Sequence, residues 1–364
     1  MLANVAQATR SNSAINAFIA AAVLDHETGE SLEYPQLIKH PKYKQLWSSS
    51  YAKELGRLCQ GFKGKDSSTR PPVDGTDTFH VIDYADIPPD RLKEVCYSNV
   101  VCKVRTEKAD PDRTRITIAG NRICYPGDVG TKTAPLELVK LMINSVLSRQ
   151  GAKFCTFDIS NFYLQTPLDR PEYIKIKITD IPQEFIHEYN LHHHVHNDWV
   201  YFEIRKGIYG LPQSGILAQK LLAERLDKKG YYQCECTPGL WRHKWRPIMF
   251  TLIVDDFGVE YVGEHNAHHL RNTIKEFYDL TENWKGDLYA GINLAWNYSK
   301  RTCHLSMADY IETVLTKYNH QRPRQPVLSP YKAASIIYGA TVQYMTMPTP
   351  PQPLMNLASN AFKA

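Results

Sequence analysis

Two stretches in the first third of the chain alternate apolar with polar residues, which is the pattern of half-buried strands. They are residues 100–105, VVCKVR, and residues 113–120, RTRITIAG, and the polar residues between them predict a turn. Successive side chains on a strand point to opposite faces. Arg113 and Arg115 therefore share one face of their strand, and Lys103 and Arg105 share one face of theirs. The two strands are therefore predicted to form a hairpin with a basic face.

Apolar residues at helical spacing predict four helices further along the chain. Pro135 is suited to the first turn of one helix, and Gly230 is suited to the position just past the end of another. The positions predicted to face the core are Leu138, Val139, Met142 and Val146 in the first helix, Leu217, Leu221 and Leu226 in the second, Ala267, Leu270, Ile274 and Phe277 in the third, and Ile311, Val314, Leu315 and Tyr318 in the fourth.

Longer apolar runs predict strands that are buried more deeply. These runs are residues 153–159, 199–207 and 248–254. The last of them leads into Asp255 and Asp256, which favour a tight turn before a further strand. A second hairpin is predicted between residues 287 and 307, so helices and hairpins are mixed along the chain.

The composition is that of a globular protein. Of the 364 residues, 43% are apolar and 22% are charged, and the length allows about two domains. The net charge of +5 permits a polyanionic partner without identifying one. Eight cysteines without a Cys-x-x-Cys pair predict free thiols in a reducing compartment. The longest apolar stretch, Ala14–Leu24, is too short to span a bilayer, so no membrane partner is expected.

Changes in composition predict three regions. Residues 61–77, GFKGKDSSTRPPVDGTD, are rich in Gly, Pro, Ser and charge, which is typical of a loop or linker. Residues 1–90 are therefore predicted to be an N-terminal subregion with its linker, and residues 91–320 the main body. The tail 321–364 is rich in Pro, Gln, Thr and Ser and predicts no compact element.

The clearest chemical signal is a set of aspartates next to buried strands. Asp158 follows one apolar run, and Asp255 and Asp256 follow another, whereas the common phosphate-loop, dinucleotide and zinc-protease motifs are absent from the sequence. A buried carboxylate is costly unless a cation compensates it. Two such strand ends side by side could hold two Mg²⁺ ions and promote phosphoryl transfer. The alternative is that Asp255 and Asp256 only make a hairpin turn.

Three segments taken together resemble a known family. FTLIVDDFGVEYVG, TFDISNFYL and IRKGIYGLPQSG resemble motifs of the reverse transcriptase region of copia-type LTR retrotransposon polyproteins, and the resemblance runs from about Glu54 to Lys317. It implies an α+β right-hand polymerase with fingers, palm and part of a thumb, in which an antiparallel palm sheet carries an Asp-Asp hairpin. The thumb or connection would lie in residues 321–364.

The same resemblance implies the catalytic residues and the metals. Asp158, Asp255 and Asp256 would be catalytic, with Asp158 and Asp255 holding two Mg²⁺ ions, or Mn²⁺ in their place. Asp256 would support the site more than it would bind metal. Gly291 would belong to the primer grip, although Ala290 stands where relatives carry a larger apolar residue.

The residues expected to bind the nucleotide follow in the same way. Tyr163 would exclude the 2′-hydroxyl, and Gln213 would touch the nucleotide, although Pro212 stands where many relatives have lysine. Lys103 and Arg115 would hold the triphosphate, because charged donors on the basic hairpin suit phosphate. Their alternative is a solvated basic hairpin.

The implied activity is RNA- or DNA-templated DNA synthesis, in which dNTPs are added to a primer 3′-hydroxyl. The partners would be a primed template and dNTPs. The implied location is the cytoplasm, within virus-like particles or outside them, with access to the nucleus, and the chain would be a fragment of a polyprotein or a decayed copy. Two alternatives stay open: a catalytically inactive nucleic-acid-binding relic of a transposable element, and a two-metal nuclease.

Overall fold

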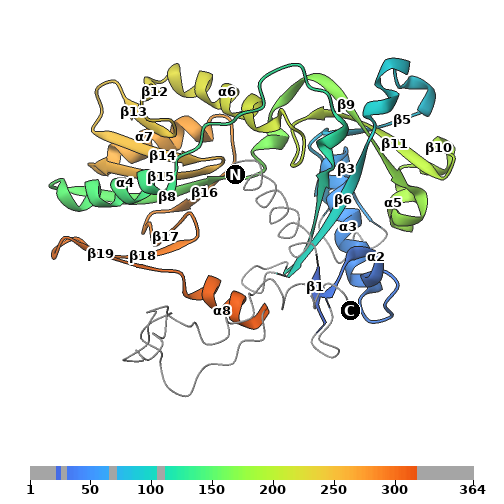
Figure 1. Ribbon diagram of the computed structural model, residues 1–364, viewed down its shortest axis with the longest axis horizontal. Helices are drawn as coiled ribbons and strands as arrows, with labels where there is room; N and C mark the ends of the chain where they lie inside the picture. The colour runs from blue at the N-terminus through green and yellow to red at the C-terminus, as the bar shows by residue number, and fades with distance from the viewer. Residues whose placement is uncertain (1–21, 26–30, 65–71, 105–110, 318–364) are drawn as a thin grey trace, which may run out of the picture. The chain divides into compact units, whose positions relative to one another are not determined.

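The computed structural model describes residues 22–25, 31–64, 72–104 and 111–317, and it divides the chain into two compact units, residues 1–306 and residues 307–364. The described part of the first unit is a mixed α+β structure with two six-stranded sheets (Figure 1). The described part of the second unit is the helix α8 (Ala308–Lys317). The tail predicted from residue 321 lies outside the described residues.

The first sheet has the strand order β10-β11-β9-β6-β7, and β5 also pairs with β11. Its pairs are antiparallel except for the parallel pair of β6 and β9. The predicted basic hairpin is confirmed as the pair of β6 and β7. The strands are β5 (Phe79–Ile82), β6 (Cys96–Val104), β7 (Asp112–Ile118), β9 (Pro167–Lys177), β10 (Val195–His196) and β11 (Trp199–Lys206).

The second sheet has the order β12-β13-β14-β15-β8-β16 and is antiparallel throughout. Its strands are β8 (Ala152–Ile159), β12 (Tyr231–Gln233), β13 (Leu240–His243), β14 (Ile248–Ile253), β15 (Asp256–Val262) and β16 (Leu280–Asn283). The strands β14 and β15 form the hairpin that the apolar run before Asp255 predicts, but its turn is Val254–Asp255, one residue earlier than predicted. Asp256 already pairs with Ile253 as the first residue of β15. The central strand β8 pairs with β15 on one side and with β16 on the other.

Three small sheets complete the strands that the structure describes. They are β1 (Val23–Leu24) with β2 (Ser31–Leu32), β3 (Gly61–Phe62) with β4 (Val73–Asp74), and the order β17 (Leu288–Tyr289), β18 (Ile292–Asn297) and β19 (Thr302–Ser306). Short 3-10 helices link several strands: η1 (Tyr84–Asp86), η2 (Pro89–Glu94), η3 (Gly120–Arg122), η4 (Tyr163–Gln165), η5 (Ile178–Asp180) and η6 (Leu191–His194).

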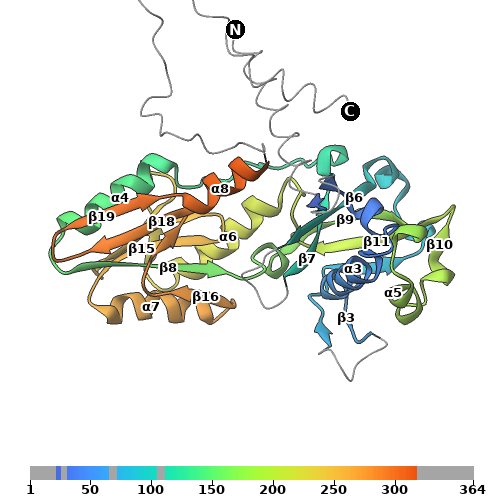
Figure 2. The ribbon, with the colours of Figure 1, turned by 90° about the horizontal axis from the view of Figure 1, so that it is seen from below.

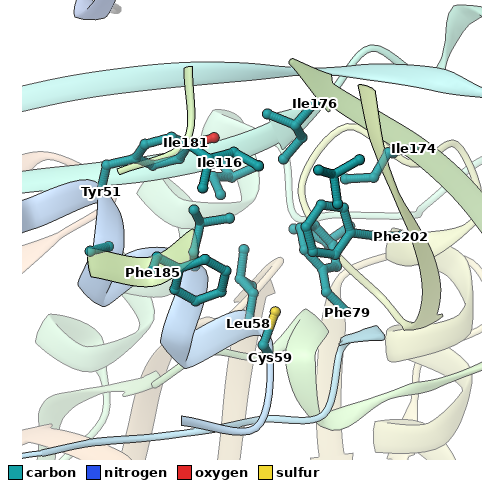
Figure 3. Packing of buried hydrophobic residues seen from close by; sticks show 14 of the residues in the cluster. Tyr51, Leu58, Cys59, Phe79, Ile116, Ile174, Ile176, Ile181, Phe185 and Phe202 are labelled. Atoms are coloured by element: carbon teal, nitrogen blue, oxygen red, sulfur yellow. The ribbon is translucent and has the colours of Figure 1, made fainter. Parts of the chain in front are cut away.

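One hydrophobic core joins the N-terminal helices to the first sheet. The helices are α2 (Tyr34–Leu37), α3 (Lys44–Leu58) and α5 (Gln183–Glu188). Tyr51 and Leu58 of α3 lie close to Ile116 of β7 and Phe202 of β11 (Figure 3). Residues before position 90 and strands after it therefore bury their apolar side chains together.

Helices cover both faces of the second sheet. They are α4 (Leu136–Ser148), α6 (Ser214–Asp227) and α7 (Glu264–Lys275). The helices α6 and α7 pack with one set of apolar side chains of the sheet, and α4 packs with Phe154 and with the sheet of β17 and β18. Figure 2 shows α4 and α7 on opposite sides of β8 and β15.

The predicted helices are confirmed, but the buried face of α6 differs from the prediction. Ala218 and Leu222 are buried together with Leu226, whereas Leu217 and Leu221 are only partly buried. Both sets fit a four-residue spacing, so the sequence pattern does not separate them; the small Ala218 allows the helix to approach the sheet closely. At the end of α7, Phe277 lies beyond the helix and is exposed. In α8, Ile311 is exposed, contrary to the prediction, and Val314 and Leu315 are only partly buried. Tyr318 lies outside the described residues.

No helix among the described residues is long and apolar enough to cross a bilayer.

Gly258 of β15 is a point of close approach between two sheets. A Cβ atom at this position would lie 2.5 Å from the ring of Tyr289, a residue of β17. The Tyr289 ring is fixed there because its hydroxyl donates to the backbone oxygen of Thr251 at 3.1 Å. The absence of a side chain at position 258 therefore lets Tyr289 lie flat on the sheet.

We expect Gly258→Ala to destabilise the protein by about 1–3 kcal/mol, because an overpacked core must displace the Tyr289 ring. Gly130→Ala is the matched control, since its Cβ would meet only the Asp128 carboxylate at 3.3 Å. The measurement is the free energy of unfolding in urea. Equal effects of the two substitutions would contradict the packing role of Gly258.

Candidate active site

A cavity of about 470 Å³ lies where the two sheets meet. Its walls come from α3, from β7, from the end of β8 and the segment that follows it, from the loop before α6 and from the turn between β14 and β15. Its polar and aromatic lining residues are Glu54, Arg57, Arg113, Arg115, Asp158, Ser160, Asn161, Tyr163, Tyr209, Asp255 and Thr281. Acidic and basic side chains far apart in the sequence thus share one cavity.

The acidic side of the cavity is built by the pairing of β8 with β15. Asp158 lies directly opposite Asp256 across this pair and opposite Thr281 of β16 on its other side. Asp255 lies in the two-residue turn that joins β14 to β15, and its carbonyl accepts a hydrogen bond from the Ile159 backbone at 3.1 Å. The three carboxylates are therefore fixed by backbone pairing and not by a flexible loop.

The first residue of that turn is in an unusual backbone conformation. Val254 has a φ of 61°, in the left-handed region, where a β-branched side chain is disfavoured. Two-residue hairpin turns require a positive φ at their first position, where glycine is usual. The backbone is therefore strained at Val254, directly before Asp255. Backbone strain of this kind is concentrated at functional sites.

Burial and mutual repulsion raise the pKa values of two of these carboxyl groups. The pKa of Asp255 is raised by burial and then by the charge of Asp158, and Arg115 opposes the shift. The pKa of Asp256 is raised to about 7 by burial, by the charges of Asp158 and Asp255, and by a hydrogen bond with Asp158. This end of the second sheet therefore favours a bound proton or a cation over three bare charges.

The opposite side of the cavity is basic. Arg113 and Arg115 lie two residues apart on one face of β7, so both side chains point toward the cavity. The helix α3 is fixed to this strand by Ser50, whose hydroxyl donates to the Asp112 carbonyl at 2.9 Å and accepts from the Thr114 backbone at 2.9 Å. The basic wall is thereby held rigidly on the first sheet.

Arg57 of α3 adds a third guanidinium to this wall. It pairs with Glu54 one turn earlier on the same helix, and it donates to the side-chain oxygen of Asn161 at 3.1 Å. Asn161 follows Asp158 in the sequence and has a φ of 54°. Arg57 thus links the N-terminal helix to the segment that follows the acidic strand.

Two tyrosines form the aromatic part of the lining. The ring centroids of Tyr163 and Tyr209 lie 4.8 Å apart at an interplanar angle of 70°, an edge-to-face contact. Burial, then Tyr209 and Asp255, raise the pKa of Tyr163 to about 12, so its hydroxyl is neutral at ordinary pH. The cavity offers a flat apolar surface beside its charged groups.

The structure brings together four of the residues that the sequence singled out: Asp158, Asp255, Arg115 and Tyr163. Asp256 pairs with Asp158 across the two strands and is not part of the lining. Lys103 is exposed and lies opposite Arg113 across the hairpin, also outside the lining.

Gln213 and Gly291 also lie away from the cavity lining. Gln213 is fully buried, and its side-chain nitrogen donates to Glu172 at 2.8 Å. Gly291 has a φ of 74° and forms the exposed turn between β17 and β18 together with Ala290, whose φ is 51°. In this structure the Gln213 side chain belongs to a buried polar cluster.

Arg57 and Tyr209 are lining residues that the sequence pattern does not predict. Tyr209 could still have been predicted from the sequence, because it lies in the segment IRKGIYGLPQSG, four residues before Gln213. Arg57 carries no local signal, since it precedes Asp158 by about a hundred residues and joins the cavity only through the packing of α3 on β7. Arg113 was assigned to the basic face but was not selected.

The carboxylates fit a site that is completed by its substrate. Within the part of the chain that the structure describes, no group of three or more His, Cys, Asp or Glu side chains is placed to hold a metal ion. Mg²⁺ is usually bound by one or two carboxylates together with water and substrate phosphates, and seldom by a cage of protein ligands alone. The two lining aspartates, with three arginines in the same cavity, suit such a cation carried with a polyphosphate.

Comparison with known proteins identifies a distant relative in yeast. A Saccharomyces cerevisiae protein named "Putative transposon Ty5-1 protein YCL074W" is 27% identical over 156 residues, which is 42% of this chain. The chain is related to a transposon protein. The match covers 46% of the length of that relative, so the chain spans about half of it. No family model matches the chain.

The raised pKa of Asp256 gives a prediction on stability. The unfolded chain releases this proton near pH 3.9, but the folded protein holds it up to about pH 7. Between these values the folded state binds more protons than the unfolded state, so stability falls as pH rises. Asp256→Asn does not ionise at this position. We expect its free energy of unfolding, relative to that of the wild type, to rise by at least about 1 kcal/mol from pH 5 to pH 8.

The measurement is urea unfolding at both pH values without divalent cations. Asp227→Asn, at an exposed carboxylate, is the control and should follow the wild type. If wild type and Asp256→Asn lost the same stability between pH 5 and pH 8, the carboxylates would not repel one another as described.

Proposed function

We propose that the chain is an RNA-directed DNA polymerase, the reverse transcriptase region of a copia-type retrotransposon. The observation that carries this proposal is the shared cavity, where Asp158 and Asp255 lie across from Arg113 and Arg115 with Tyr163 beside them. The relation to a transposon protein supports the same origin. In this proposal the second sheet corresponds to the palm and the first sheet to the fingers of a right-hand polymerase.

Asp158 and Asp255 would hold magnesium, and Mn²⁺ would fit the same oxygen ligands. When bound, two Mg²⁺ ions would activate the primer 3′-hydroxyl and neutralise charge on the leaving pyrophosphate. Asp256 would keep Asp158 in position across the β8–β15 pair. Because the carboxylates repel one another, their site favours a divalent cation.

The basic wall would bind the triphosphate of the incoming dNTP. Arginine suits this task because its planar guanidinium donates two parallel hydrogen bonds to phosphate oxygens. Arg113 and Arg115 project from one rigid strand, and Arg57 is oriented by Glu54 and Asn161. The basic wall and the carboxylates would then hold the phosphates between them, with the reacting phosphorus near Asp158.

Tyr163 would contact the sugar of the dNTP. It lines the same cavity as Asp158 and Asp255. Its ring is supported by Phe162 at 5.7 Å and by Tyr209 at 4.8 Å between centroids. A supported ring excludes a 2′-hydroxyl by overlap, which would select deoxynucleotides.

As a retrotransposon enzyme, the protein would act in the cytoplasm, inside virus-like particles, on a primed RNA or DNA template.

We expect Asp158→Asn and Asp255→Asn to abolish primer extension while primer-template affinity stays within about tenfold, because basic residues supply most of the binding energy. Extension is measured on primed poly(A) with dTTP and Mg²⁺. The matched control is Asp227→Asn, which changes an exposed carboxylate.

The same assay separates the alternatives. Wild-type protein that binds the primed template but extends nothing would be a nucleic-acid-binding relic, and wild-type protein that cleaves it would be a nuclease. If Asp255→Asn kept half of the wild-type rate, the assignment of the metal ligands would be wrong.

We expect Tyr163→Val to retain measurable dTTP incorporation and to accept UTP much better than the wild type does. A smaller side chain removes the clash with the 2′-hydroxyl, whereas a mere packing defect would weaken both substrates together. The measurement is the ratio of kcat/KM for dTTP over UTP on one primed template. If kcat/KM fell equally for dTTP and UTP, so that their ratio stayed unchanged, the role of Tyr163 would be purely structural.

A further inference from the structure

Tyr209 lies between the two groups that the proposed function assigns to the two ends of the nucleotide. On one side its ring meets the ring of Tyr163, the residue expected at the sugar, with centroids 4.8 Å apart. On the other side the guanidinium carbon of Arg115, expected at the triphosphate, lies 5.7 Å from the centroid of the Tyr209 ring. Tyr209 thus touches both and lines the cavity itself.

The backbone around Tyr209 is fixed to the basic strand. The Tyr209 carbonyl accepts a hydrogen bond from the backbone of Ile118, the last residue of β7, at 2.8 Å. Gly210 has a φ of 98°, and a Cβ atom there would lie 2.0 Å from the Ile118 oxygen. This contact is closer than any side chain allows, so Gly210 is required for the loop to lie against the strand that carries Arg115.

The same loop is fixed to the segment that carries Tyr163. The backbone of Gly207 donates to the Thr166 carbonyl at 2.8 Å. A Cβ atom on Gly207 would lie 2.9 Å from the carbonyl oxygen of Tyr163. The loop therefore approaches the backbone of Tyr163 closely at Gly207 and the end of β7 closely at Gly210, with Tyr209 between these two contacts.

The end of the loop is anchored in the interior. The Ser214 hydroxyl accepts a hydrogen bond from the Ile208 backbone at 2.9 Å, and Gln213 donates to the buried Glu172. Glu172 in turn pairs with Arg91 and Arg170. The loop from Gly207 to Gln213 is consequently held at several points, so the Tyr209 ring has a fixed place.

We propose that Tyr209 is a positioning residue that couples sugar selection at Tyr163 to triphosphate binding at Arg115. This inference rests on the proposed function and deepens it: the ligand is a deoxynucleoside triphosphate, recognised at both ends at once. An edge-to-face aromatic contact and a cation–π contact each hold their partner at a set place. Loss of the Tyr209 ring frees Tyr163 and Arg115 together, although neither is altered.

The test compares two substitutions of Tyr209 with one control. Tyr209→Phe keeps the ring and both contacts, whereas Tyr209→Leu keeps apolar bulk without an aromatic face. Tyr232→Leu is the matched control, because Tyr232 is 39% exposed on β12, close to the 37% of Tyr209. The measured quantities are KM for dTTP and the ratio of kcat/KM for dTTP over UTP on primed poly(A) and primed poly(dA).

For Tyr209→Leu we expect KM for dTTP to rise about three- to tenfold and the dTTP/UTP ratio to fall by a similar factor, because both contacts are lost. Tyr209→Phe should have the KM and the dTTP/UTP ratio of the wild type, and Tyr232→Leu should leave both quantities unchanged. A structural role alone would lower the unfolding temperature or kcat without changing the ratio. An unchanged ratio and KM in Tyr209→Leu would overturn the inference and leave the polymerase proposal standing.

A double-mutant cycle with Arg115→Ala tests the coupling itself. If Tyr209 positions Arg115, the rise in KM for dTTP in the double variant Tyr209→Leu/Arg115→Ala is smaller than the product of the two single effects. Multiplying effects would show that the two residues act independently, which contradicts the proposal.

A binding measurement keeps the test separate from turnover. The dissociation constants of dTTP and UTP are measured by calorimetry on a primed template with a dideoxy-terminated primer, in Mg²⁺. A wild type that binds dTTP without extending primers would contradict the proposed function, and the Kd ratio in Tyr209→Leu would still decide the role of Tyr209. A wild type that binds neither nucleotide would overturn both.

Discussion

The site depends on the antiparallel pairing of β8 with β15, because this pairing brings acidic side chains together at one end of a buried sheet. Asp158 and Asp256 face each other as direct partners, and the turn before β15 adds Asp255. Their repulsion and burial work against folding, as the raised pKa values of Asp255 and Asp256 indicate. The surrounding apolar core must therefore supply the stability that this sheet end lacks.

The compensating positive charge is held by a different apolar cluster. The first sheet and α3 share one apolar cluster, and this packing places Arg57 on the same wall as Arg113 and Arg115. A cavity with carboxylates on one side and guanidinium groups on the other produces a field that suits a ligand with both cations and phosphates. The electrostatic character of the site thus depends on the contact between the two sheets.

A buried polar cluster keeps the loop between the sheets in place. Glu172 is fully buried and interacts with Arg91, Arg170 and Gln213. Buried ion pairs contribute little net stability, because desolvation offsets their attraction, but removing one partner is costly. The cluster is consequently better understood as fixing the geometry of the Tyr209 loop than as strengthening the fold. It also explains why Gln213 is turned away from the cavity.

Neighbouring residues along the chain are enough to predict the local elements and the chemistry of the acidic strands. The alternation around Arg113 and Arg115, the spacing of the α4 core positions and the Asp255 turn all depend on neighbouring residues, so they can be recognised in a linear pattern. Tertiary packing determines which face of α6 is buried, places Arg57 in the cavity and turns Gln213 away from it. Those outcomes depend on contacts between residues about forty to a hundred positions apart, and such contacts leave no periodic signal in the sequence.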